Sequence, residues 1–242
     1  TGQAFRSYAA QTSDNWALFK QALQDHDANL QGELSMFCSV TASYSFLDDI
    51  LGRFRQQHPG IEIKLHTGDS AATLDRIRHE EEDIGIAALP ERIPSQFAVL
   101  ELSSSPLVFI APAKMALPGL ETLQSGKVRW NEVPLIVSES GLVRDSLDRW
   151  FRKMKLKPRI QAQVAGHEAI VSMVGLGFGA GVVPRIVLEN SPFAGKVRQL
   201  QVEHALRPIT IGLCVLKRKL NHALIRAFWT LAGQAPARNI QL

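Results

Sequence analysis

Hydrophobic and polar residues alternate along most of the chain in two periods. Apolar runs with strand-like spacing cover residues 33–40, 61–66, 83–88, 97–102, 107–111, 135–138, 160–164, 180–183, 197–200 and 209–216. Helical spacing predicts helices over residues 44–57, 71–80, 141–154, 166–175 and 221–232. Polar turns are predicted at residues 41–43 and 103–106. Because helices alternate with strands, we predict an α/β fold with mainly parallel sheets.

The first thirty residues carry a different pattern. Positions at alternating spacings of four and three form a heptad-like stripe on one long helix, apolar except at Thr12 and His26. Such a stripe either pairs with a second copy of the chain or packs on the chain's own globular body. We favour dimerisation through the apolar members, which are Phe5, Ala9, Trp16, Phe19, Leu23 and Leu30.

Residues 164–184 (VAGHEAIVSMVGLGFGAGVVP) predict a strand, a helix, a glycine turn and a second strand. The glycines at 175, 177, 179 and 181 do not form a dinucleotide fingerprint, because they close a helix and precede a strand. Free backbone donors are expected instead at Gly166 and His167, where the helix begins. Two interpretations remain: this helix start binds an anion, or it is an ordinary helix end facing water.

Composition narrows the class of protein. The chain has 242 residues, is 45% hydrophobic and carries a formal net charge of +4, a mild excess that does not by itself indicate nucleic acid. Its beginning lacks a signal-peptide pattern and no apolar run is long enough to span a membrane, so we expect a cytoplasmic protein with buried, reduced Cys38 and Cys214. The basic run at residues 149–159 is interpreted as a solvated helix end.

The sequence contains no clear motif of a catalytic or metal site. The seven histidines show no metal-ligand spacing, and residues 138–141 do not form a nucleophile elbow. We therefore expect no enzyme activity, no metal and no cofactor.

Four blocks then resemble the effector-binding region of LysR-type transcriptional regulators: LSMFCSVTAS, FRQQHPGIEIKLHTGD, DIGIAAL and HEAIVSMVGLGFGAGVVP. The resemblance covers essentially the whole chain. It implies two Rossmann-like subdomains joined by two crossover strands, as in periplasmic binding proteins. The first subdomain would hold residues 32–111 and 210–242, the second residues 112–209, and a dimerisation linker helix would occupy residues 1–31.

The resemblance also implies a function. Within the family it is nearest to activators of branched-chain amino-acid biosynthesis, which sense 2-acetolactate and 2-aceto-2-hydroxybutyrate and control the acetohydroxy acid isomeroreductase gene. The expected partners are this small effector, further copies in a dimer or tetramer, and DNA through a winged helix-turn-helix outside these residues. A periplasmic-type solute-binding protein for a small organic anion remains the alternative.

The effector would lie in the cleft between the subdomains, at strand ends and helix starts. By resemblance, Ser39, Thr41, Ser138, Gly166 and His167 match positions that commonly touch effector, and Thr67 and Ser104 are weaker candidates. Hydroxyl and amide groups can bind a carboxylate without a buried lysine or arginine, each bond contributing about 0.5–1.5 kcal/mol. For each serine or threonine, a turn or cap role is the alternative. Glu139 is expected to point away from the cleft.

Overall fold

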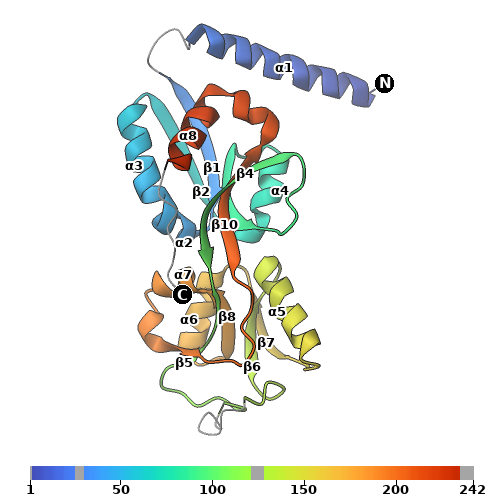
Figure 1. The fold of residues 1–242 in the computed structure, drawn as a ribbon, viewed down its shortest axis with the longest axis vertical. Coiled ribbons are helices and arrows are strands. Elements are labelled where there is room, and N and C mark those ends of the chain that lie inside the picture. The colour runs from blue at the N-terminus through green and yellow to red at the C-terminus, as the bar shows by residue number, and fades with distance from the viewer. Residues whose placement is uncertain (1, 25–29, 121–127, 235–242) are drawn as a thin grey trace.

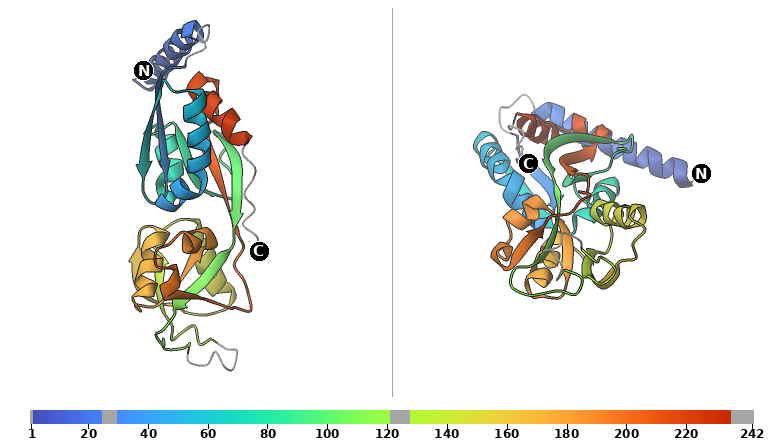
Figure 2. Two further views of the ribbon diagram at one scale, coloured as in Figure 1. Left: turned by 90° about the vertical axis from the view of Figure 1, so that its left-hand side faces the viewer. Right: turned by 60° about the horizontal axis from the view of Figure 1, so that its bottom comes forward.

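The chain folds into two α/β lobes stacked end to end, with a separate helix above them (Figure 1). The structure, a computed structural model, describes residues 2–24, 30–120 and 128–234, and for residues 3, 4, 7 and 17–24 it describes the backbone alone. Helices lie on both faces of each sheet (Figures 1 and 2). The predicted α/β class with two Rossmann-like units is confirmed.

The first lobe is built on a sheet of order β2-β1-β3-β10-β4. Strands β2, β1 and β3 are parallel, and β10 runs antiparallel to β3 and β4. The strands are β1 (Gly32–Cys38), β2 (Ile61–Thr67), β3 (Ile84–Leu89), β4 (Phe97–Ser105) and β10 (Ile209–Leu216). The helical segments are α2 (Val40–Ala42), the π-helical η1 (Ser43–Leu47), α3 (Asp48–Gln57), η2 (Ser70–Ala72), α4 (Thr73–Arg78), η5 (Lys217–Asn221) and α8 (Ala223–Gly233).

The second lobe repeats this plan with the order β7-β6-β8-β5-β9. Strands β7, β6 and β8 are parallel, whereas β5 runs antiparallel to β8. The strands are β5 (Leu107–Pro112), β6 (Pro134–Ser138), β7 (Arg159–Val164), β8 (Ala180–Pro184) and β9 (Val197–Leu200). The helical segments are α5 (Leu142–Lys153), α6 (His167–Gly175), α7 (Arg185–Glu189) and η4 (Ala194–Lys196).

Two chain passages join the lobes, at Pro106 and at residues 201–208 (Figure 1). The expected boundary at residue 111 is wrong, because β5 pairs with β8 and β9 and so belongs to the second sheet. The expected turn at 103–106 is also wrong in part. Strand β4 continues through Ser105, since Ser104 and Ser105 pair with Thr210 and Ile209 of β10.

The interior of each lobe is filled as the hydrophobic pattern predicts. Val143, Leu147, Trp150 and Phe151 form the buried face of the amphipathic helix α5. Around Trp150, ring centroids lie 4.8–6.2 Å apart in a tilted and edge-on cluster with Phe109, Trp130 and Phe151. In the first lobe, Phe54 of α3 packs edge-on against Phe228 of α8 at 5.1 Å. These cores hold rigid sheets whose ends can present a site.

Helix α1 (Gly2–Gln24) stands apart from both lobes (Figure 1). Its Phe5, Tyr8 and Trp16 are exposed by 72%, 67% and 59%. Residues 25–29, including the expected seam position His26, lie outside the described part, as do the side chains of Phe19 and Leu23. Leu30 is not helical and packs against the hydrophobic core, and its part in dimerisation stays a prediction.

Cys38 and Cys214 are buried and unpaired, as expected. Burial raises the pKa of the Cys38 thiol to about 11 and that of Cys214 to about 12. Both thiols therefore behave as small apolar groups inside the first lobe.

Candidate ligand-binding cleft

Four helix starts meet between the lobes, because each follows a parallel strand whose carboxyl end points into the gap. Strand β1 leads into α2 at Ser39, β2 into η2 at Asp69, β6 into α5 at Gly141, and β7 into α6 at Gly166. Carboxyl ends of parallel strands are where α/β folds usually bind ligands. The cleft is thus built by the repeated strand-to-helix order of both lobes.

Two adjoining cavities occupy this cleft. The larger, of about 170 Å³, is lined from the first lobe by Asp69, Ser70, Ala71, Leu74, Ala88 and Pro90, and from the second by residues 140–143, Asp145 and His167. The smaller, of about 40 Å³, lies between Ser39, Thr41, Phe46 and the apolar ends of β8 and α7. Ser70, Ala88 and His167 line both cavities. Drug-sized ligands need sites of roughly 300–1,000 Å³, so this cleft suits a smaller molecule.

His167 stands at the junction of the two cavities. Its Nε2 atom is buried and has no hydrogen-bond partner among the described residues. Burial lowers the pKa of His167 below its ordinary value, and the nearby Glu168 and Asp69 carboxylates only partly oppose this. The imidazole is therefore neutral at pH 7. Its buried Nε2 atom, which has no hydrogen-bond partner in the protein as described, is free to form a hydrogen bond with a ligand.

The helix starts of the first lobe are already capped from within the protein. The Ser39 hydroxyl accepts a hydrogen bond from the Ala42 N–H at 3.2 Å, and the Asp69 carboxylate accepts one from the Ala71 N–H at 3.0 Å. The Thr41 N–H and hydroxyl donate to Oε1 of Glu168, from the second lobe, at 3.0 and 2.6 Å. Backbone donors on this wall are thus largely satisfied.

The helix starts of the second lobe are different. Gly141 and Gly166 are the N-cap residues of α5 and α6, with φ of +92° and +79°, and neither has a side chain to cap its helix. Close by, Ser138 at the end of β6 has a buried Oγ atom without a partner among the described residues. This wall therefore offers open donors to an anionic or carbonyl oxygen.

The residues predicted from the sequence do not all meet at the cleft. Ser39, Thr41 and His167 line a cavity, and Gly166 begins the helix beside them. Ser138 is buried and is not among the residues that line either cavity. Thr67 and Ser104 are exposed ladder residues, paired with Cys38 and Thr210, and neither lines the cavities described above. Glu139 is exposed and also outside this lining, as expected.

Three contributors were not among the predicted site residues. Ser70 lines both cavities, Gly141 lets α5 begin at the larger one, and Glu168 crosses to Thr41. The sequence holds a signal for two of them, since Gly68-Asp69-Ser70 and Ser140-Gly141 are turns that precede helices. The expected polar turn at 41–43 is wrong, because Ser39 is the N-cap of a helical stretch that begins at Val40.

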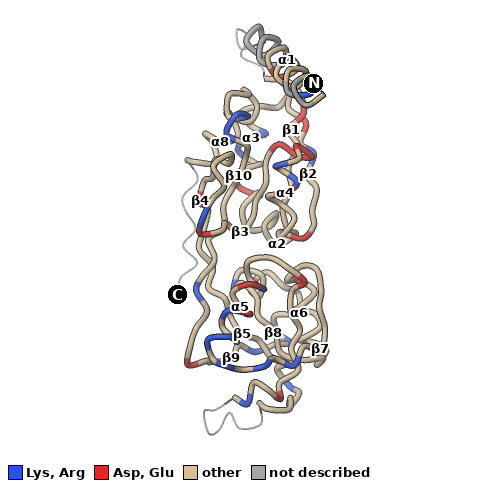
Figure 3. Tube along the Cα trace, turned by 90° about the vertical axis from the view of Figure 1, so that its right-hand side faces the viewer, with Lys and Arg blue, Asp and Glu red and all other residues tan. Residues whose placement is uncertain are grey.

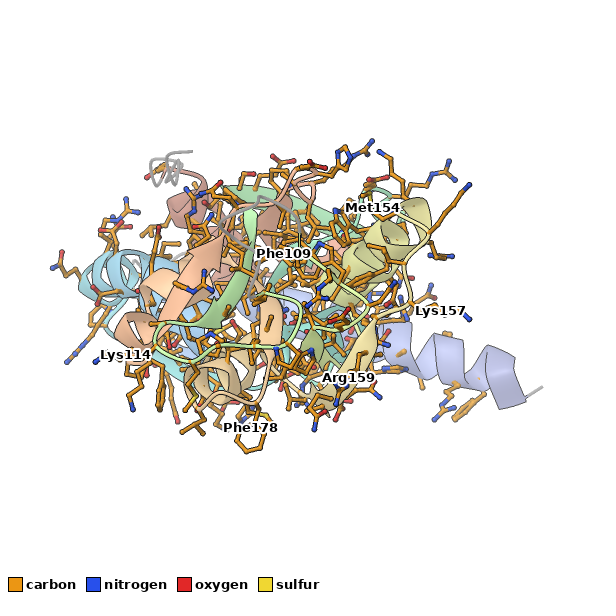
Figure 4. The ribbon with its side chains drawn as sticks, turned by 90° about the horizontal axis from the view of Figure 1, so that it is seen from below. Phe109, Lys114, Met154, Lys157, Arg159 and Phe178 are labelled. Carbon is orange, nitrogen blue, oxygen red and sulfur yellow. The ribbon has the colours of Figure 1, made fainter. Side chains whose placement is uncertain are left out.

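Charge is distributed unevenly around the cleft. Acidic residues flank it on both lobes (Figure 3), among them Asp69, Asp145 and Glu168. Lys114, Lys157 and Arg159 lie on the end of the second lobe that is seen from below, as does the exposed Phe178 (Figure 4). The basic run at 149–159 therefore extends toward the end of the lobe opposite the cleft.

The described residues contain neither a candidate metal site nor a helix suited to cross a membrane. The His, Cys, Asp and Glu residues of the described part form no group of three or more that could hold a metal ion. Among the described helices, none combines the length and apolar character that a membrane crossing requires.

Comparison with known proteins agrees with this architecture. Residues 27–237 match the model of the LysR substrate binding domain. The HTH-type transcriptional activator IlvY of Haemophilus influenzae is 39% identical over 231 residues, which cover 95% of this chain and 79% of that protein. The IlvY activator of Salmonella typhimurium is 41% identical over 233 residues, with the same shares covered.

Among solved structures, the effector binding domain of QuiR in complex with shikimate superposes with a TM-score of 0.69 at 20% identity, covering 84% of this chain and 96% of that one. At this identity the likeness supports the fold alone. The extent of the family match and of the two close relatives settles the family: the chain belongs to the LysR-type transcriptional regulators and contains their effector-binding domain.

Proposed function

We propose that the chain is the effector-sensing and oligomerisation region of a transcriptional activator that responds to 2-acetolactate and 2-aceto-2-hydroxybutyrate. Its target would be the acetohydroxy acid isomeroreductase gene of branched-chain amino-acid biosynthesis. The IlvY activators, about 40% identical over 95% of the chain, support this assignment. They favour a regulator over a solute-binding protein or an enzyme.

The single observation that carries the proposal is the small cleft with open polar groups on its second-lobe wall. A hydroxy keto acid has one carboxylate, one carbonyl and one hydroxyl. The uncapped starts of α5 and α6 can donate to the carboxylate, and the His167 imidazole can bond a neighbouring oxygen. The apolar ends of β8 and α7 would receive the methyl groups.

Signalling would follow from the position of the cleft between two lobes. Contacts cross it at Thr41–Glu168 and at Ser45–Asn190, where the Asn190 side chain donates to Ser45 Oγ at 3.3 Å. A ligand that touches both lobes shifts the population toward one relative orientation. In this proposal the change reaches a DNA-binding winged helix-turn-helix through the dimer or tetramer formed by α1.

Calorimetric titration with 2-acetolactate tests the assignment. The wild-type chain should bind it, and His167→Ala should bind it at least 10-fold more weakly, because Nε2 loses its bond to the ligand. His79→Ala is the matched control, since His79 is an exposed histidine at the end of α4. An absence of binding by the wild type would refute the proposed effector, and equal affinities for all three proteins would refute the contact between His167 and the ligand.

A further inference from the structure

Glu168 belongs to the first turn of α6 in the second lobe, yet its carboxylate is bound by the first lobe. Its Oε1 atom accepts two hydrogen bonds from Thr41, one from the backbone N–H at 3.0 Å and one from the hydroxyl at 2.6 Å. Thr41 lies in the first turn of the continuous helical stretch formed by α2, η1 and α3. A carboxylate of the protein itself therefore occupies the helix start of the first lobe.

This carboxylate is ionised at neutral pH. Burial alone would raise the pKa of Glu168, but the hydrogen bonds from Thr41 and from its own backbone N–H, with the proximity of His167, hold that pKa below its ordinary value. A negative charge at a helix start is also stabilised by the helix dipole. The first-lobe wall thus carries a fixed negative charge where a ligand anion would otherwise bind.

The other helix start on this wall is filled in the same way. The Asp69 carboxylate accepts the Ala71 N–H at 3.0 Å and lines the larger cavity. On the second-lobe wall no side chain caps the start of α5 or α6, although the Glu168 N–H bonds its own carboxylate, and the buried Nε2 of His167 has no partner among the described residues. The cleft accordingly has room for one ligand carboxylate, on the second-lobe side.

We propose that Glu168 is a specificity-determining residue that restricts the cleft to monocarboxylates by filling, with its own carboxylate, the position that the second carboxylate of a dicarboxylic acid would take. This inference rests on the proposed function, since it assumes that the cleft binds a small organic acid. It goes further by assigning the rejection of dicarboxylates to one side chain and its partner Thr41.

A matched pair of ligands isolates this effect. Citramalate shares the hydroxyl, methyl and carboxylate groups on the central carbon of 2-acetolactate but carries a carboxymethyl group, and so a second carboxylate, in place of the acetyl group. Calorimetry on the wild type should show at least 10-fold weaker binding of citramalate than of 2-acetolactate. In Glu168→Ala, citramalate should gain at least 10-fold. Glu139→Ala, which removes an exposed glutamate outside the cavity lining, should keep the wild-type preference.

The outcomes separate the two proposals. Equal wild-type affinities for both acids, or a folded Glu168→Ala protein with no gain for citramalate, overturn the role of Glu168 and leave the proposed effector untouched. A wild type that ignores 2-acetolactate while Glu168→Ala gains citramalate refutes the effector and supports the role of Glu168. If Glu168→Ala does not fold, the same affinities are compared in Glu168→Gln. This variant keeps an acceptor for Thr41 without the charge, so citramalate should again gain affinity, and no gain would overturn the role of Glu168.

Discussion

Gly141 at the start of α5 faces Ala71 of η2 across the cleft so closely that an ideal Cβ atom built on Gly141 would lie 3.1 Å from the Cβ of Ala71. Gly141 also has φ of +92° and ψ of 177°, a conformation that is essentially restricted to glycine. Backbone therefore meets a small side chain where the two lobes approach. This contact limits how far the cleft can close over the larger cavity.

Gly141→Ala should hold the lobes apart and weaken ligand binding about 10-fold, because its methyl group meets Ala71. The unfavourable φ should also lower the free energy of unfolding by about 1–3 kcal/mol. Calorimetry with 2-acetolactate and thermal unfolding measure the two effects separately.

The double variant Ala71→Gly/Gly141→Ala serves as the control. It removes the Cβ atom that the new methyl group would meet, so affinity should recover while the lower stability remains. Affinity that stays at the level of the single variant would show that the contact between the lobes is irrelevant to binding.

Local patterns predicted most elements of both lobes, and the errors have identifiable physical causes. The helix after β1 was expected to begin at residue 44, but Ser39 caps it and it starts at Val40. Val40 and Thr41 are β-branched and look unfavourable for a helix, and tertiary packing overrides this preference. The serines before Pro106 look like a turn, yet pairing with β10 keeps them in β4.

Long-range contacts were the part that sequence patterns could not predict. Nothing near Leu107 indicates that β5 pairs with β8 and β9 in the second sheet. The sequence pattern indicates only that Glu168 is an ordinary acidic residue in the first turn of its own helix. Its partner Thr41 lies 127 positions earlier, so their contact emerges only when both lobes are in place.

Stability should depend on pH through His167. Burial lowers the pKa of His167 below the value near 6.5 that it has in the unfolded chain, despite the opposing Glu168 and Asp69. Below pH 6.5 the unfolded chain therefore binds a proton that the folded chain does not. The free energy of unfolding should fall as pH falls from 7 to 5, by at most about 1.4 kcal/mol per pH unit for this one group.

His167→Gln should make this dependence shallower. Denaturant unfolding at several pH values above 5 measures it. His222, whose pKa is also lowered by burial, keeps part of the slope in every variant. Parallel pH profiles for wild type and His167→Gln would contradict the burial of a neutral imidazole.

Helix α1 should carry the contact between copies of the chain. Phe5 and Trp16 are large, exposed residues on the same stripe of a helix that lies away from both lobes. The wild type should sediment as a dimer or larger species, and Phe5→Ser/Trp16→Ser should shift it toward monomer at micromolar concentration. Phe178→Ser, at an exposed aromatic residue on the second lobe, should not.

The two thiols should be unreactive in the folded chain. Their raised pKa values, about 11 for Cys38 and about 12 for Cys214, leave almost no thiolate at pH 8. A thiol reagent should modify neither residue in buffer and both in denaturant. Rapid modification of the native protein would show that the first lobe opens far more readily than its packing indicates.

The central claim is that the cleft between the lobes binds a small hydroxy keto acid. A crystal structure of the chain grown with 2-acetolactate tests it most directly. The account predicts the ligand between the lobes, with its carboxylate at the starts of α5 and α6, an oxygen bonded to His167 Nε2, and Glu168 still bound to Thr41. A ligand bound elsewhere on the chain, or a ligand carboxylate seated on Thr41 in place of Glu168, would contradict it.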